Sequence, residues 1–294
     1  MTVASPCVGT CKLDDATGWC VGCARTGDEI AEWGGLAEPA RTVVWDALPD
    51  RFQRLGVACR RLPWTLEDVR EFVLLSLRER AGTWALGVVG AVAEFAPPQG
   101  ARVEVEAEGD VVVASTAGGR LRFRIDDDVR ALVFDPPETP ETQRRVVLVV
   151  KRERGRLPAV DAIDDLGPDR DAIRAEDREA RLFDLGLGRK EGRFCVRCPS
   201  GPARDALAGA VGMSLASALP RIGPALVQAS PARVVESALG RIEVASAIPV
   251  PGGVSPPGPH THLLPDHLAT GRAMPTGMDL PRAYLPGAIF YPAR

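Results

Sequence analysis

The pattern of hydrophobic and polar residues in the middle of the chain is that of an antiparallel sheet. Between residues 103 and 125, hydrophobic residues alternate with polar ones, mostly Glu or Arg, and glycine-containing turns separate successive runs. This period of two, broken by tight turns, predicts strands that pair with their neighbours along the chain. The other segments predicted to be extended are residues 84–95, 130–134, 145–150 and 194–197. Residues 234–237 and 241–247, on either side of Leu239 and Gly240, suggest a hairpin.

Three further segments have the spacing or composition of helices. Residues 66–80 carry apolar side chains at helical intervals after Thr65, which together with Asp68 can cap the start of a helix. A second helix is predicted at residues 169–182, within a charged region that fits either a solvated helix and loop or a charged binding surface. A third is predicted at residues 203–219, where Pro220 should end it.

Composition divides the 294 residues into three parts. Residues 1–62 are rich in cysteine and tryptophan, and residues 65–248 contain the predicted sheet and most of the predicted helices. Residues 249–294 are rich in proline and glycine, which disfavours regular elements there. We therefore expect an α+β protein. A small four-cysteine metal-binding module with two short helices would be followed by a larger domain with an antiparallel sheet and several helices. Thr26 and Glu29 have the spacing of a capping box, which would begin the first short helix of the module.

The overall composition excludes several classes of protein. Hydrophobic residues make up 45% and charged residues 26% of the chain, as is typical of a soluble globular protein. A net charge of −3 disfavours nucleic-acid binding, and no apolar run approaches the ~18 residues of a membrane span. The N-terminus lacks the basic and apolar regions of a secretory signal. We expect a cytoplasmic protein with, if any macromolecular partner, a protein partner.

Four cysteines near the N-terminus give the sharpest chemical signal. Cys7, Cys11, Cys20 and Cys23 form two closely spaced pairs. Four thiolates satisfy the tetrahedral coordination of Zn²⁺ or hold an iron–sulfur cluster, and the spacing alone leaves both open. Because four protein ligands leave no open position on zinc, a structural, interaction or electron-handling role is favoured over catalysis. A module of this size also buries little surface, so a metal would stabilise it.

The N-terminal region resembles a bacterial family of unknown function labelled predicted iron–sulfur protein. The residues that carry this resemblance are residues 5–14 and 18–26 with Glu29, Ile30, Trp33, Arg41, Leu48 and Arg51. The resemblance implies that Cys7, Cys11, Cys20 and Cys23 are the ligands. Pro39 and the long C-terminal extension depart from the usual small form, so the resemblance implies nothing about residues 65–294.

A histidine cluster near the C-terminus is a second candidate metal site. His260, His262 and His267 are the three histidines of the chain and lie within eight residues. Imidazoles, with Asp266 as a carboxylate, are suitable ligands for zinc or iron. An alternative function is therefore a metal-dependent enzyme that uses His260 and His262. The simpler interpretation is a surface loop in which these side chains make hydrogen bonds.

Cys195 and Cys198 form a lone Cys-x-x-Cys motif, which suggests a dithiol redox protein as another alternative. Such a centre needs a lowered thiol pKa, as at a helix N-terminus, whereas residues 199–202 delay the next predicted helix. Two ordinary thiols on a strand are the other interpretation. The sequence contains no P-loop, no dinucleotide-binding fingerprint and no nucleophile elbow.

Overall fold

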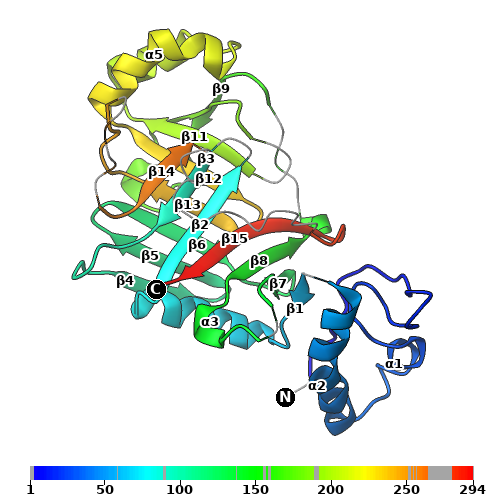
Figure 1. Cartoon of the computed structure of the whole chain (residues 1–294). Coiled ribbons are helices and arrows are strands. Elements are labelled where there is room, and N and C mark those ends of the chain that lie inside the picture. The colour runs from blue at the N-terminus through cyan, green and yellow to red at the C-terminus, as the bar shows by residue number, and fades with distance from the viewer. Residues whose placement is uncertain are drawn as a thin grey trace.

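Two large antiparallel sheets and a few helices make up the α+β fold, as the sequence predicts (Figure 1). The computed structural model describes residues 3–57, 59–88, 91–136, 138–154, 157, 160–188, 192–250, 253, 255, 257–263 and 280–293. Among these residues, no helix is both long enough and apolar enough to cross a membrane.

The first sheet has seven strands, and every neighbouring pair is antiparallel. In spatial order they are β1 (Arg60–Arg61), β7 (Val129–Val133), β8 (Val146–Lys151), β15 (Tyr284–Pro292), β2 (Gly82–Val88), β3 (Ala91–Phe95) and β14 (His260–Leu263).

The second sheet has eight antiparallel strands and includes the predicted meander and hairpin. In spatial order they are β4 (Glu104–Glu108), β5 (Val111–Thr116), β6 (Gly119–Arg124), β13 (Gly240–Val244), β12 (Ala232–Ser237), β11 (Gly192–Cys198), β10 (Arg181–Asp184) and β9 (Asp164–Pro168).

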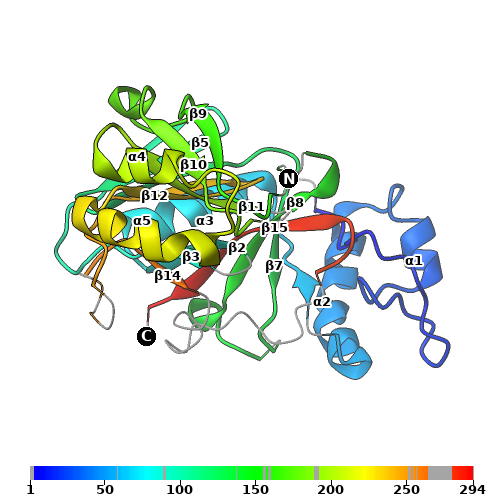
Figure 2. The same ribbon diagram turned by 90° about the horizontal axis from the view of Figure 1, so that it is seen from above.

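The helices lie at the ends and edges of these sheets. They are α1 (Gly27–Ala31), α2 (Glu38–Leu55), α3 (Leu66–Arg78), α4 (Pro202–Ala208) and α5 (Leu215–Ala229), with short 3₁₀ turns η1 (Glu141–Gln143), η2 (Arg152–Arg154) and η3 (Ala175–Asp177). The N-terminal module with α1 and α2 lies at one end of the molecule, and α5 lies at the other (Figures 1 and 2).

The two sheets pack face to face around one hydrophobic core. Trp84 of β2 reaches across to Phe123 of β6, with ring centroids 5.3 Å apart and an edge-on geometry. The indole Nε1 of Trp84 donates a hydrogen bond of 3.0 Å to Ser76 Oγ of α3, so its polar atom is satisfied inside the core. Helix α3 begins at the predicted Thr65 cap and buries Val73 against the same core.

The predicted helix at residues 203–219 is wrong in its bounds. The structure has two helices there, separated by a turn at residues 209–214 in which Gly212 adopts a φ of +85°. Helix α5 starts after Ser214, whose side chain caps it, and continues through Pro220 instead of ending there. A proline inside a helix costs about 3 kcal/mol, but α5 buries an apolar face on the main core, and this burial offsets the cost.

The C-terminal segment is more regular than its composition predicts. Strand β15 is not a surface appendage, because it lies between β8 and β2 in the middle of the seven-stranded sheet. The register shifts between Pro286 and Ala288 where β15 pairs with β8, so the proline sits at a bulge. Strand β14 also belongs to this segment and forms an edge of the same sheet.

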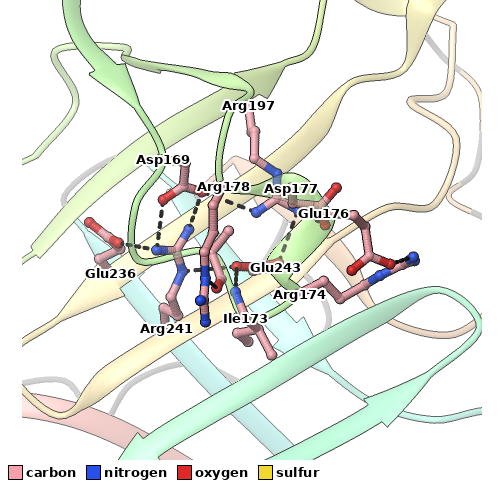
Figure 3. Close-up of polar contacts among 11 residues, drawn as sticks. Asp169, Ile173, Arg174, Glu176, Asp177, Arg178, Arg197, Glu236, Arg241 and Glu243 are labelled. Atoms are coloured by element: carbon pink, nitrogen blue, oxygen red, sulfur yellow. Dashed lines mark hydrogen bonds and ion pairs between the residues drawn. The ribbon is translucent and has the colours of Figure 1, made fainter.

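The helix predicted at residues 169–182 is also wrong, because the segment contains only the short turn η3 and the start of β10. Two of its side chains, Asp169 and Asp177, join a buried ion network (Figure 3). Asp169 accepts two hydrogen bonds from Arg241, at 3.1 and 2.7 Å, and one from Arg197 at 3.0 Å. Glu243 lies within 3.0 Å of Arg197 and 3.1 Å of Arg241. Asp169 thus ties this segment to the outer face of the eight-stranded sheet, while other charged side chains of the segment, such as Asp171, are exposed.

We predict that Asp169→Ala lowers the free energy of unfolding by about 3–5 kcal/mol, because it removes one of the two buried carboxylates that Arg197 and Arg241 share. The matched control is Asp171→Ala in the same segment, where the side chain is exposed and the expected change is within about 0.5 kcal/mol. Urea unfolding followed by circular dichroism measures both. Equal effects for the two variants would contradict the structural role of the network.

Candidate functional site

A short hairpin positions the N-terminal cysteines. Leu13 and Cys20 form an isolated antiparallel bridge, and the Asp14 N–H donates a 2.8 Å hydrogen bond to the Trp19 carbonyl. The Asp14 carboxylate accepts hydrogen bonds from the backbone and the hydroxyl of Thr17, which closes the turn between the two cysteine pairs. The hairpin thus folds the segment that contains Cys20 back along the segment that follows the first pair.

The turn between Cys20 and Cys23 packs against the segment that contains the first cysteine pair. The Ala24 N–H donates a 2.7 Å hydrogen bond to the Cys20 carbonyl, which closes this turn. Gly22 lies directly against Thr10, and a Cβ atom added to Gly22 would be only 2.6 Å from the Thr10 carbonyl oxygen. The absence of a side chain at Gly22 therefore permits the two cysteine pairs to lie near one another.

The sulfur atoms have different environments. Cys20 and Cys23 are buried, whereas Cys11 is exposed. Burial alone would raise the pKa of Cys20, but hydrogen bonds from the backbone N–H groups of Gly22 and Cys23 outweigh it and lower the pKa. Burial raises the pKa of Cys23, and Arg25, whose Nε lies 3.4 Å from the Cys23 sulfur, opposes that rise.

The four cysteines are arranged as two pairs and do not form a closed tetrahedron. All seven cysteines of the chain are free thiols. With Zn–S bonds of about 2.3 Å, four sulfurs would lie about 3.8 Å apart. In the described part of the chain, no three cysteine sulfurs lie within 4.8 Å of one another. The donor types fit zinc or an iron–sulfur cluster. A single zinc ion would require the sulfurs to move closer together, whereas a cluster holds its cysteine sulfurs farther apart.

The two helices of the module follow the cysteines, as predicted, although α2 is longer than a short helix, with 18 residues. Thr26 and Glu29 form the predicted capping box of α1, and Arg51 of α2 binds the Glu29 carboxylate at 2.6 and 3.0 Å. The fully buried apolar core of the module consists of Ala24, Val44, Leu48 and Phe52. Such a small core provides little stability without an additional constraint.

The second site lies at the edge of the seven-stranded sheet opposite β1, where β14 pairs with β3. His260 is directly opposite Glu94 in the antiparallel register, and His262 is opposite Val92. Because alternate residues of a strand point to the same face, these three polar side chains lie together on the face that does not pack on the second sheet.

The functional atoms of these side chains converge. The Nε2 atoms of His260 and His262 are 2.5 Å apart, and each lies 3.7 Å from one oxygen of the Glu94 carboxylate. Glu94 is fully buried, while the histidine side chains are 17% and 15% exposed. The structure thus brings together two of the predicted residues with a carboxylate that the sequence analysis missed.

One feature of the sequence does set Glu94 apart as a candidate: it is the only charged residue of an otherwise apolar strand, Ala91–Phe95. Its pairing with a strand far along the chain cannot be read from local spacing. The carboxylate and the third histidine that the sequence suggested, Asp266 and His267, lie outside the described residues.

The Cys195 and Cys198 thiols do not form a dithiol centre. Both lie on β11 at an odd spacing, so they point to opposite faces of the sheet, and they belong to different hydrophobic clusters. Burial raises the pKa of Cys198 to about 11, and burial also raises the pKa of Cys195. Neither thiol is therefore activated as a nucleophile, and the interpretation as two ordinary thiols agrees with the structure.

Comparison with known proteins gives a family for both parts of the chain. Residues 5–52 match the model of a protein of unknown function (DUF1289), which confirms that the cysteine-rich N-terminal region resembles a family of unknown function. Neither the curated proteins nor the solved structures contain a match. Residues 68–294 match the model of a family of unknown function (DUF6925), a range that includes Glu94, His260 and His262. Because this match covers most of the chain, the protein belongs to the DUF6925 family.

Proposed function

We propose that this is a metal-binding protein whose N-terminal module holds a zinc ion or an iron–sulfur cluster through Cys7, Cys11, Cys20 and Cys23. Its role would be non-enzymatic, either interaction with a protein partner or the handling of electrons. The observation that supports this most directly is the close approach of the two cysteine pairs where Gly22 meets Thr10.

The chemistry of the buried sulfur atoms supports the proposal. Metal ligation requires thiolates, and the backbone N–H groups that lower the pKa of Cys20 favour its thiolate form. The guanidinium of Arg25 beside Cys23 adds positive charge next to a second sulfur. N–H donors aimed at sulfur are the outer-shell contacts that stabilise and tune a thiolate-bound metal. Free cysteines suit the reducing conditions of the cytoplasm, where we place the protein.

The energetics of the module point the same way. Its small apolar core is supplemented by polar contacts such as the pair between Arg51 and Glu29, which is partly exposed and contributes little. Structural zinc contributes on the order of 10 kcal/mol to the folding of small domains. A bound metal would therefore supply most of the stability that this module cannot obtain from burial alone.

The two candidate centres would give the module different roles. A closed four-thiolate zinc site has no free coordination position and does not change its redox state, so it would build a rigid surface for a protein partner. An iron–sulfur cluster would exchange electrons at a potential set by its hydrogen bonds and exposure. Visible absorption of the anaerobically purified protein separates them, because a cluster is coloured and zinc is not.

We predict that Cys20→Ser/Cys23→Ser removes the metal of the N-terminal module, since it replaces both buried ligands. Elemental analysis for zinc and iron, with acid-labile sulfide, should show a loss of one zinc or one cluster per chain relative to wild type. Cys59→Ala is the matched control, because Cys59 lies outside the four-cysteine set and should leave the metal content unchanged. The same metal and sulfide content in wild type and the double variant would contradict the proposal.

Gly22→Ala tests whether the close approach of the two cysteine pairs matters. An added Cβ would meet the Thr10 carbonyl and push the Cys7–Cys11 segment away, so we predict at least a tenfold faster loss of metal to a competing chelator. Gly34→Ala is the control, because nothing lies within 4 Å of a Cβ atom there. Equal rates of metal transfer in the two variants would show that this contact does not assemble the site.

A further inference from the structure

We propose that Glu94, His260 and His262 form a second, mononuclear metal site that takes a divalent first-row transition ion. This site is independent of the four-cysteine module, because it lies on the seven-stranded sheet and uses nitrogen and oxygen donors. The proposal goes beyond the function proposed above and does not require it.

The register between β14 and β3 is what assembles the three donors. His260 and His262 are two residues apart on β14, and Glu94 faces His260 across the ladder. A shift of one residue in this pairing would send both imidazoles to the opposite face, where Thr261 now lies. The ligand set is therefore a consequence of backbone hydrogen bonding, and it is in place without rearrangement of the chain.

The distances agree with a shared ion. Metal–nitrogen and metal–oxygen bonds of about 2.1 Å place neighbouring donor atoms about 3.0–3.4 Å apart. The observed separations of 2.5 Å between the two Nε2 atoms and 3.7 Å from each to a Glu94 oxygen lie on either side of that range. Small side-chain rotations would thus bring all three donors to equal distance from one central ion.

Apolar side chains surround the three donors on the outer face of the sheet. Glu94 is fully buried, and its outer-face neighbours besides His260 are apolar, as with Ala85 and Val92. A divalent ion bound by these donors would therefore lie in surroundings of low polarity, where its attraction to the carboxylate is strong.

Contacts behind His260 fix its orientation before any ion arrives. His260 Nδ1 lies 2.6 Å from the Gly258 carbonyl, and since a carbonyl only accepts, Nδ1 carries the proton. The lone pair of Nε2 is then directed toward His262 Nε2, between which atoms a metal would bind. Gly258 has a φ of +116°, a conformation that other residues rarely adopt. Ser246 Oγ donates a 2.9 Å hydrogen bond to the Pro259 carbonyl and anchors the same segment to the end of β13.

The donor set selects the class of ion. Two imidazoles and one carboxylate suit zinc, iron(II) and neighbouring transition ions, whereas magnesium and calcium prefer oxygen donors alone. The soft thiolate site of the N-terminal module favours different chemistry, so the two sites can be loaded and detected separately.

Cobalt(II) is the test ion, because its visible spectrum distinguishes thiolate ligands from nitrogen and oxygen ligands. The full-length protein, stripped of metal with a chelator, is titrated with cobalt(II) chloride while absorption and heat are recorded. We expect one site with the weak bands of nitrogen and oxygen ligation. Glu94→Gln and, separately, His262→Gln should weaken this site more than about 100-fold, because even loss of an outer-shell contact costs 10–100-fold. Thiolate-to-cobalt bands belong to the four-cysteine site.

Thr261→Val is the matched control, since it lies between the two histidines on the opposite face and should leave cobalt affinity unchanged. Thermal unfolding without metal confirms that each variant is folded, and His262→Gln on the edge strand provides a second variant should Glu94→Gln unfold. Absence of the nitrogen–oxygen site in wild type, or equal cobalt affinity in wild type and both ligand variants, would overturn this inference. Absence of the thiolate bands alone would overturn only the function proposed for the N-terminal module.

Discussion

Alternate residues of a strand point to opposite faces of its sheet. This constraint determines which side chains build the core and which lie together on the outer faces. In both sheets the inward-facing residues build one core around Trp84 and Phe123. The outward-facing residues are then free to differ between the sheets. On the eight-stranded sheet they include Arg197 and Arg241, which bind Asp169 of a covering segment. On the seven-stranded sheet they place Glu94 beside two histidines.

The same constraint explains which cysteines can act together. Cys195 and Cys198 are close in sequence, but the strand that carries them directs their sulfurs to separate hydrophobic clusters. The N-terminal cysteines lie instead on turns and a short hairpin, where glycine and left-handed backbone conformations permit sulfur atoms to gather. The spacing of two cysteines in the sequence therefore indicates whether their sulfurs can meet only when the secondary structure between them is known.

Local patterns in the sequence predicted the elements whose determinants are local. The Thr65 cap, the meander of β4 to β6 and the capping box at Thr26 all depend on residues within a few positions of one another, and all are present. The predictions that fail concern elements whose determinants lie far apart in the sequence. Pro220 lies inside α5 because tertiary burial outweighs its cost, and the proline-rich tail supplies a central strand because β8 and β2 offer partners on both sides.

The candidate sites follow the same division. The cysteine quartet and the histidine pair are visible as short motifs, but Glu94 precedes His260 by well over a hundred residues and only the sheet register joins them. Likewise, no spacing rule shows that Gly22 is in contact with Thr10. The sequence predicts which side chains have metal chemistry, and the long-range strand pairing determines which of them meet.

We propose that this one chain contains two metal centres with different ligand classes. Anomalous diffraction from crystals of the metal-loaded protein, collected at the zinc and iron absorption edges, would locate both. We expect one peak among the sulfurs of Cys7, Cys11, Cys20 and Cys23, and another within bonding distance, about 2.1 Å, of Glu94, His260 and His262. Crystals that show ordered side chains at both places and no anomalous peak at either would contradict it.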